Sequence, residues 1–177
     1  MSDRAATLVM GVGNLLMGDE GVGVHVAQRL LAGPRVPGGV ELLDGGTGSF
    51  ALLEALTAHP RAMLIDACLD GRPAGTVRIR RPRRAAHFPT ALGAHDIGLR
   101  SLVEAAELLG HLPRVTLVTV SVRVPFIMGL ELSAPVAAAF PRVEALVRRW
   151  ARRLERLAAQ ARRVDAAAPQ LEAACRA

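Results

Sequence analysis

The feature that most constrains the fold of this chain is a regular alternation of short apolar runs with segments of helical periodicity. Continuous apolar runs such as Thr7–Val12 and Ala62–Ile65 are typical of strands that are buried on both faces of a sheet. The intervening segment Gly21–Leu31 repeats its apolar residues at the spacing of one helical face. This order predicts an α/β fold in which a parallel sheet lies between two layers of helices.

The expected fold class is α/β, a three-layer sandwich with a twisted, mostly parallel five-stranded sheet and helices on both faces. The predicted strands cover Thr7–Val12, Val40–Leu43, Ala62–Ile65, Gly75–Arg80 and Val115–Val122. The predicted helices cover Gly21–Leu31, Phe50–Leu56, Ile97–Leu109 and 135–157, the last with an interruption near Pro141. A length of 177 residues fits one domain, which we place at residues 1–163, with a frayed tail at 164–177.

Composition narrows the class of protein. Apolar residues make up 51% of the chain and charged residues 21%, which is typical of a globular chain and not of a disordered one. Cys68 and Cys175 are too far apart in sequence to form a disulfide framework or a zinc-ligand pair. No apolar run approaches the roughly 18 residues of a membrane span, and Met1–Thr7 lacks the apolar core of a signal peptide. We therefore expect a cytoplasmic protein with no membrane partner.

The net charge of +6 raises the question of nucleic-acid binding. Aromatic residues make up only 3% of the chain and tyrosine is absent, so there is little from which to build a base-stacking platform. The chain also has no lysine, which excludes Schiff-base chemistry and the lysine of a phosphate-binding P-loop. We therefore expect no nucleic-acid partner; such a partner would predict salt-sensitive retention on DNA.

Arginine gathers in two segments of the chain. One cluster comprises Arg78, Arg80, Arg81, Arg83 and Arg84. The other, on the last predicted helix, comprises Arg148, Arg149, Arg152, Arg153 and Arg156. The first cluster could contact an acidic partner, and the second could form a docking surface. A solvated surface is the simpler explanation of both, and we favour it.

Acidic residues and one histidine follow the ends of the predicted strands. Glu20 lies after the first strand, Asp44 after the second and Asp66 after the third, while His95 opens the helix that follows the fourth. The carboxyl ends of neighbouring parallel strands meet at one edge of a sheet, where such folds bind their ligands. Two carboxylates 4 Å apart repel by about 4 kcal/mol at an effective dielectric near 20, so this cluster needs a cation or a retained proton.

Glu20, Asp66 and His95 therefore form a candidate metal site. Two carboxylates and one imidazole, with open coordination positions, suit Zn, Ni, Mn or Fe. A helix cap or a turn would explain any one of these residues equally well, and Asp19 could cap the helix that begins near Glu20. A shared function explains the three together better, because three separate caps would not need the same sheet edge.

The glycine-rich loop after the first strand does not match a nucleotide-binding motif. Leu16 stands where the dinucleotide-binding motif requires its third glycine. Asp19 and Glu20 stand where a P-loop has lysine and serine or threonine, and their charge would repel phosphate. The glycines most simply permit a tight turn from strand to helix.

Other residues carry less weight as functional candidates. Cys68 could be a nucleophile beside His95, but a buried, reduced cysteine is far commoner. His25, within the first helix, is expected in the core or behind the site. Three further histidines are expected at ordinary polar positions near loops and helix ends, namely His59, His87 and His111.

A set of motifs in this chain resembles those of the hydrogenase maturation endopeptidases. The motifs are Gly11–Gly23, Leu43–Thr47, Leu64–Ala67, Gly75–Val77, His95–Leu99, Leu109–Pro113 and Gly129–Ser133. They follow the family's order and spacing over roughly Leu8 to Leu154, which makes the resemblance specific. The apolar stretch Ser121–Met128 departs from the family, in which a more polar segment is expected.

The resemblance implies a cytoplasmic peptidase that removes a C-terminal extension from the precursor of a [NiFe] hydrogenase large subunit. In this family the nickel belongs to the substrate, and cleavage follows its insertion. The metal-contacting positions correspond to Glu20, Asp66 and His95, which we also expect to be catalytic, with Asp44 as a substrate-positioning or acid–base residue. The family is sometimes classed with the aspartic (aspartyl) proteases, although its chemistry is unlike that of a two-aspartate dyad. Its fold is a twisted, mostly parallel sheet flanked by helices.

A second function, of a different class, would use the same three residues. A non-catalytic, nickel-sensing or nickel-delivering chaperone of hydrogenase assembly would bind the loaded precursor without shortening it. Other divalent ions could occupy the site in place of nickel. Nothing in the sequence demands an oligomer, so we expect a monomer whose partner is the precursor.

Overall fold

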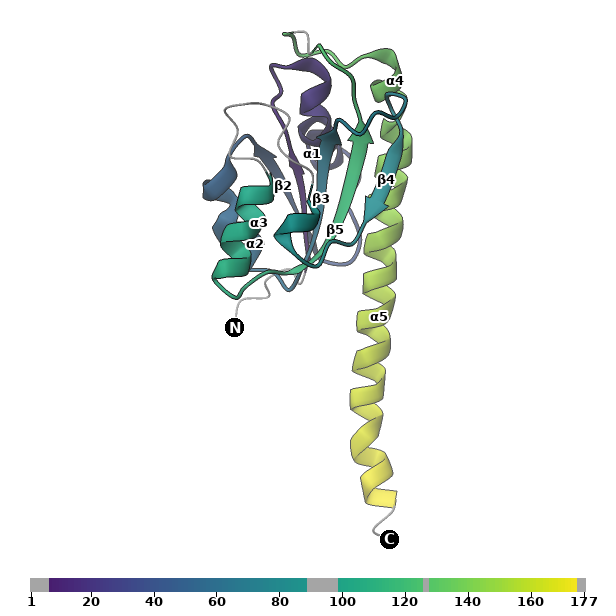
Figure 1. Ribbon diagram of the computed structural model, residues 1–177. Coiled ribbons are helices and arrows are strands. Elements are labelled where there is room, and N and C mark those ends of the chain that lie inside the picture. Colours follow the sequence, from purple (N-terminus) through teal and green to yellow (C-terminus); the bar gives the residue numbers. More distant parts are fainter. Residues whose placement is uncertain (1–6, 89–98, 126–127, 175–177) are drawn as a thin grey trace.

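A computed structural model of the chain describes residues 7–88, 99–125 and 128–174, with the side chains of residues 49 and 161–174 left out of the description. Within these residues, five strands form one sheet in the order β2-β1-β3-β5-β4 (Figure 1). The strands are β1 (Thr7–Val12), β2 (Val40–Gly46), β3 (Arg61–Cys68), β4 (Val77–Arg80) and β5 (Arg114–Ser121). All neighbours pair in parallel except β4, which is antiparallel to β5. The predicted five-stranded, mostly parallel sheet is confirmed.

Helices cover both faces of the sheet, as the α/β prediction requires. They are α1 (Val22–Ala32), α2 (Leu53–Thr57), α3 (Leu99–Leu108), α4 (Ala134–Ala137) and α5 (Phe140–Ala174). Single 3-10 turns are η1 (Gly18–Gly21), η2 (Ser49–Leu52) and η3 (Ala85–His87). In the described part of the chain, none of these helices combines the length and the apolar character that a membrane crossing requires.

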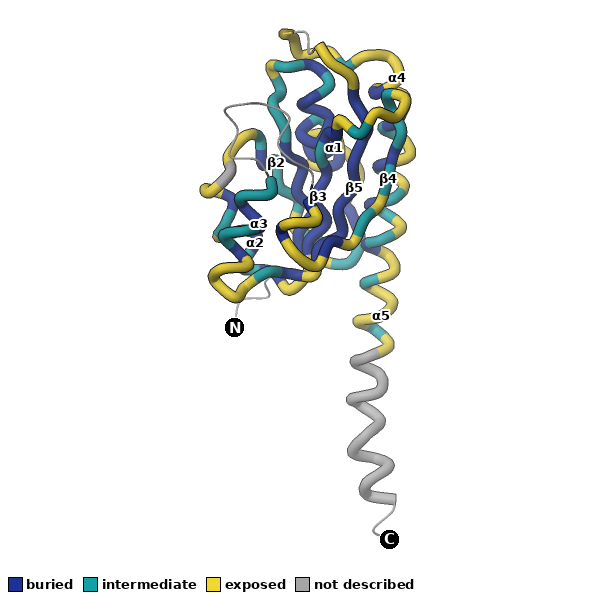
Figure 2. The backbone as a smooth tube through the Cα atoms, viewed as in Figure 1, coloured by how far each residue is buried: buried dark blue, intermediate teal, exposed yellow. Residues whose placement is uncertain are grey.

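Alternate residues of each buried strand build two separate apolar cores. On β3, Met63 and Ile65 pack with residues of α1 and α5, whereas Leu64 packs with residues of α2 and α3. This division follows from the period of two in a strand, which points successive side chains to opposite faces. Figure 2 shows the central strands buried along their length. Each fully buried Leu or Ile contributes about 1.5–3 kcal/mol, so the sheet is a firm support for the loops at its ends.

Two strands continue past their predicted ends. β2 extends to Gly46 and β3 to Cys68, so Asp44 and Asp66 lie within strands and not after them. A polar residue was expected to end each strand, but backbone hydrogen bonding to the neighbouring strands determines where a strand ends. Asp66 remains level with Thr119 of β5, and Cys68 with Ser121.

The last predicted helix is divided in two and is longer than expected. α4 ends at Ala137 and α5 begins at Phe140, in agreement with the interruption predicted near Pro141. α5 then continues to Ala174, well beyond the expected end near Leu157, and projects past the edge of the sheet at which β3 and β5 begin (Figure 1). The division into a domain at 1–163 and a tail at 164–177 stays a prediction.

Candidate functional site

The carboxyl ends of β2, β1 and β3 lie side by side at one edge of the sheet. Gly11 of β1 is level with Asp44 of β2 on one side and with Ile65 of β3 on the other. Asp66 follows Ile65 directly, and Glu20 follows β1 within η1. Neighbouring strands thus deliver three acidic residues to the edge where parallel sheets bind ligands.

Glycines allow α1 to begin in direct contact with the backbone of the sheet. A Cβ on Gly11 would overlap the carbonyl oxygen of Gly23, and a Cβ on Gly23 would overlap the carbonyl oxygen of Ile65. Gly13 has a φ of 136°, and a Cβ there would overlap the carbonyl oxygen of Glu20. Only glycine fits such contacts. The loop therefore holds η1, and Glu20 with it, directly against the ends of β1 and β3.

Glu20 is buried, with only 8% of its surface exposed. It lies in η1 immediately before α1, where the partial positive charge of a helix amino end favours a carboxylate by roughly 0.3–1 kcal/mol. Burying a carboxylate is costly unless it is hydrogen-bonded, paired or bound to a cation. A buried glutamate at the ligand-binding edge of a sheet is therefore a candidate functional residue and not a solvated one.

Asp66 is half-buried near the end of β3. The next residue, Ala67, packs in the core beside α1 and α5, so strand alternation directs Asp66 toward the face covered by α2 and α3. The Oδ1 atom of Asp66 accepts a hydrogen bond from the N–H of Ala67 at 2.8 Å. α3 begins at Leu99 on that same face of the sheet.

The third predicted ligand, His95, lies outside the described residues. Within the described ranges, no group of three or more His, Cys, Asp or Glu side chains is arranged to hold a metal ion. The set Glu20, Asp66 and His95 therefore stays a prediction. Two of its members belong to neighbouring parts of one sheet edge, since η1 follows β1 and β1 pairs with β3.

Asp44 lies at the same edge but on the opposite face of the sheet from Asp66. Its Oδ2 atom accepts a hydrogen bond from Nε2 of Gln28 in α1 at 2.9 Å, and its Oδ1 atom accepts one from the N–H of Gly46 at 3.0 Å. These two contacts fix both the carboxylate and the irregular end of β2, where the register with β1 shifts. An aspartate held in this way suits a positioning role better than proton transfer beside Asp66.

Asp19 does not cap the adjacent helix, because neither η1 nor α1 has a side-chain cap. Its carboxylate instead accepts two hydrogen bonds from Ser133, one from the N–H and one from the hydroxyl, each at 2.7 Å. The N–H of Gly18 also donates to the carbonyl of Gly129 at 2.9 Å. We call these contacts the loop clasp. It joins the loop that carries Glu20 to the segment before α4, a pairing that the sequence did not predict.

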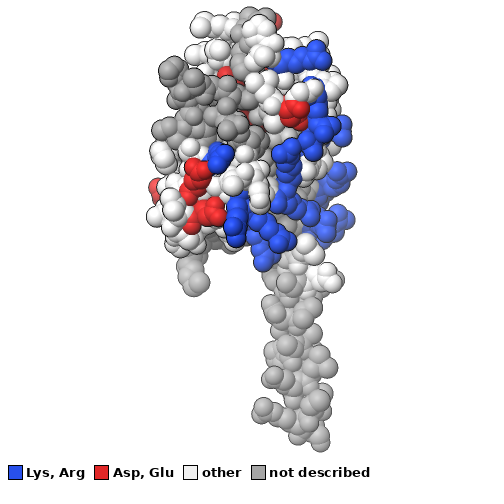
Figure 3. All heavy atoms as spheres, viewed as in Figure 1, with Lys and Arg blue, Asp and Glu red and all other residues white. Residues whose placement is uncertain are grey.

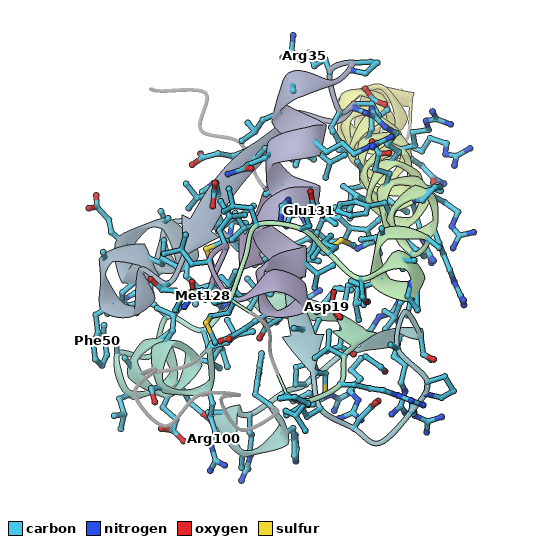
Figure 4. The ribbon with its side chains drawn as sticks, turned by 90° about the horizontal axis from the view of Figure 1, so that it is seen from above. Asp19, Arg35, Phe50, Arg100, Met128 and Glu131 are labelled. Atoms are coloured by element: carbon cyan, nitrogen blue, oxygen red, sulfur yellow. The ribbon has the colours of Figure 1, made fainter. Side chains whose placement is uncertain are left out.

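A groove of about 840 Å³ opens beside the loop clasp, and pockets of this size accommodate ligands. Its lining includes Asp19 and most of the segment from Arg123 to Ser133. Figure 4 looks down on this edge of the sheet and shows Asp19 and Met128 on either side of the start of α1. Met128 is 82% exposed and Leu130 56%, which leaves apolar surface available to a ligand. The apolar stretch that departs from the family pattern thus contributes to a groove wall.

Cys68 is buried at the end of β3. Burial raises the pKa of its thiol, and the negative charges of Asp70 and Asp66 raise it further, while Arg80 and Arg78 oppose them. A thiol with a raised pKa stays protonated at neutral pH and is a weak nucleophile. This environment favours the buried, reduced cysteine over the nucleophile.

We expect the Cys68 thiol to be protected in the folded protein. In a Cys175→Ser background, iodoacetamide should modify Cys68 at least about ten-fold more slowly in buffer than in urea, because both burial and the raised pKa suppress the thiolate. Mass spectrometry over time measures both rates. Equal rates would restore Cys68 as a candidate nucleophile.

Asp70 is held in its charged form by its neighbours. Burial alone would raise the pKa of its carboxyl, but the Ser121 hydroxyl, the Arg72 N–H and the guanidinium groups of Arg72 and Arg78 outweigh burial, so the pKa is lowered. Its Oδ2 atom lies 3.4 Å from Nε of Arg72 and 3.6 Å from a terminal nitrogen of Arg78. These contacts order the turn between β3 and β4.

The lowered pKa of Asp70 predicts a pH-dependent contribution to stability. Because the native pKa lies below its ordinary value of 3.8, the contribution is complete above that value and is lost as the pH falls through the native pKa. Asp70→Asn should reduce the free energy of unfolding by about 1 kcal/mol at pH 7, and by less below about pH 4. Urea unfolding at both pH values measures the difference. An undiminished loss at low pH would mean that packing, not charge, is responsible.

The histidines differ in environment. His59 is only 4% exposed, its Nδ1 atom lies 2.7 Å from the Ala55 carbonyl oxygen, and its Nε2 atom lies 3.3 Å from the Glu41 carboxylate. The prediction of an ordinary polar position for His59 is therefore wrong, because its ring is buried between the end of α2 and Glu41 of β2. His25 is half-buried, with its ring edge-on to Phe140 at 6.4 Å, while His87 and His111 are exposed as expected.

Comparisons with known proteins agree with one another. The model of the family described as hydrogenase maturation protease (HycI) matches residues 24–150. The hydrogenase 2 maturation protease of Escherichia coli K12 is 34% identical over 143 residues, which cover 79% of this chain and 82% of that protein. HupD of Rhizobium leguminosarum bv. viciae, a hydrogenase expression/formation protein, is 32% identical over 137 residues, 76% of this chain and 68% of that one.

Solved structures show the same likeness. The hydrogenase maturating endopeptidase HybD from E. coli matches with a TM-score of 0.69 and 31% identity, covering 81% of this chain and 92% of that chain. The [NiFe] hydrogenase maturation protease HycI from Thermococcus kodakarensis matches with a TM-score of 0.63 at 24% identity, which supports the fold alone.

Proposed function

The chain belongs to the hydrogenase maturation protease family and is a peptidase of [NiFe] hydrogenase maturation, and we propose that it removes the C-terminal extension from the nickel-loaded precursor of the large subunit. The observation that carries this proposal is that a chain of this family gathers Glu20 and Asp66 at the carboxyl edge of its sheet. That edge adjoins a groove large enough for a peptide segment.

In this proposal the nickel is part of the substrate. Glu20, Asp66 and His95 contact the nickel centre of the bound precursor and thereby place its scissile peptide against the sheet edge. Two carboxylates and a neutral imidazole form a donor set that suits nickel, and other divalent ions can replace it. A divalent ion polarises a carbonyl or activates water, and fixing the peptide beside it removes much of the entropic barrier.

Asp44 acts as a positioning residue in this proposal. Its carboxylate is held by Gln28 and by the Gly46 N–H, so it orders the end of β2 beside the substrate. Asp44→Asn should therefore slow cleavage much less than a change at Glu20 or Asp66.

The groove beside the loop clasp binds the extension through its exposed apolar residues. Met128→Asp combined with Leu130→Asp should raise KM about ten-fold and leave kcat nearly unchanged, because about 1–2 kcal/mol of apolar burial is lost on binding. Both side chains are largely exposed, so the fold is retained. The matched control is Leu108→Asp, at an 89% exposed position outside the groove. An equal rise in KM in the control would exclude a specific role for the groove.

Purified chain mixed with nickel-loaded precursor provides the direct test. A loss of mass from the precursor's C-terminus supports the peptidase, and precursor without nickel should stay intact. A stable complex with unchanged precursor mass would instead indicate a nickel-sensing chaperone. Intact mass spectrometry together with gel filtration distinguishes these outcomes.

We place this reaction in the cytoplasm, with the chain acting as a monomer on its precursor. The support for this compartment is that Cys68 is a free, buried thiol, as is typical of proteins in a reducing compartment. Light scattering of the purified protein tests the oligomeric state. Fractionation of cells that produce it tests the compartment.

A further inference from the structure

A second cavity, of about 710 Å³, opens at the edge of the sheet opposite the candidate site. Arg61 and Arg114 begin β3 and β5 and are level with each other in the sheet. Arg81 and Arg83, just after β4, and Arg153 of α5 complete a set of five arginines around the cavity. We call this the arginine cavity. Figure 3 shows the wider gathering of basic side chains over β4 and the adjoining part of α5.

The five arginines have no acidic partners within the described part of the chain. Other arginines do have partners, for example Arg29 with Glu144 at 3.1 Å and Arg100 with Glu104 at 2.9 Å. No aspartate or glutamate is among the described residues that line the cavity. Guanidinium groups of one sign gathered around a hollow raise its positive potential, which an anionic ligand relieves.

Apolar side chains also line the arginine cavity. Trp150 and Leu154 of α5 and Leu112 before β5 line it and are half-buried. A tryptophan and several arginines around a hollow are the residues that most often dominate binding energy at protein interfaces. Arginine also binds carboxylates through two parallel hydrogen bonds, which ammonium groups cannot match.

We propose that the arginine cavity binds an acidic segment of a protein partner, with an apolar side chain against Trp150 and Leu154 and with Asp or Glu carboxylates on the five arginines. A nucleic acid fits less well, because Trp150 is the one aromatic residue among the described lining residues and cannot stack successive bases. A lipid surface fits less well, because the arginines surround a hollow and do not form a flat face. Binding here leaves the edge with Glu20 and Asp66 accessible to the precursor.

The test uses the full chain and a fluorescein-labelled peptide of alternating glutamate and leucine. Fluorescence anisotropy should show saturable binding that weakens with salt. Arg83→Gln combined with Arg114→Gln should weaken binding about ten-fold, as expected for two exposed charge pairs. The matched control, Arg35→Gln combined with Arg142→Gln, removes the same charge at exposed positions outside the cavity and should bind like the unchanged chain.

Three results would overturn the proposal. They are no binding of the acidic peptide, equal weakening by both double variants, and tighter binding of single-stranded DNA or of phosphatidylserine vesicles than of the peptide. Trp150→Ala gives an independent check, because it should weaken peptide binding without altering the arginines. Cleavage of nickel-loaded precursor is measured separately, so failure of the peptide to bind leaves the proposed function intact.

Discussion

Glu20→Gln and Asp66→Asn are each expected to slow cleavage of nickel-loaded precursor by more than about 100-fold. Each change removes a negative charge that contacts the cation in our proposal and preserves the shape of the side chain. His95→Ala is expected to have an effect of the same size, because an imidazole ligand is lost. Single-turnover cleavage, followed by the mass of the precursor, measures all three rates.

The matched control for these variants is Glu104→Gln. Glu104 lies on α3 in an exposed ion pair with Arg100, and surface pairs of this kind contribute at most about 1 kcal/mol. The control should cleave at the rate of the unchanged chain, and circular dichroism should show that every variant is folded. Full processing by folded Glu20, Asp66 and His95 variants would rule out the proposed metal-contacting set.

Gly11→Ala and Gly23→Ala are expected to have the largest effects on stability. At both positions the added methyl group would overlap a backbone carbonyl oxygen, which cannot rotate away as a side chain does. Overpacking of this kind costs about 3 kcal/mol or more, because either α1 or a strand must move. For a chain of this size the corresponding fall in Tm is roughly 6–12 °C. Urea unfolding and thermal denaturation measure the loss.

Gly71→Ala is the control that distinguishes the cost of steric overlap from the cost of an unfavourable backbone conformation. Gly71 has a φ of 73°, and no atom outside Gly71 and its two chain neighbours lies within 4 Å of the position of an added Cβ. Its replacement should cost only the roughly 1–2 kcal/mol of a left-handed residue that carries a Cβ. Losses of equal size at Gly71, Gly11 and Gly23 would contradict the close packing of α1 on the sheet.

Much of the fold could be predicted from local patterns. The apolar runs that became β1, β3 and β5 and the helical spacing that became α1 indicated a parallel sheet covered on both faces. The general geometry of such folds then predicted that the ligand-binding site lies at the carboxyl edge of the sheet. Asp44 and Asp66 were correctly expected at one edge, since their strands flank β1.

The remaining features depend on contacts between distant residues. The bond between Asp19 and Ser133 spans 114 positions, and a local pattern at Asp19 equally well predicts a helix cap. The contact of His59 with Glu41 of β2 joins residues that are distant in the sequence, so the residues around His59 do not predict it. The opposite faces of Asp44 and Asp66 depend on strand register, which only the assembled sheet defines.

The contact of α1 with the sheet through glycine backbone limits how far the backbone of the candidate site can move. Where main chain contacts main chain, no side chain can repack to alter the separation between the backbone of Glu20 and that of Asp66. Local opening of the contact between α1 and the sheet therefore requires the backbone of α1 to move away from the strands. A change of side-chain rotamer is not sufficient. The Cα atoms of Glu20 and Asp66 should keep their spacing up to the temperature at which the sheet itself unfolds.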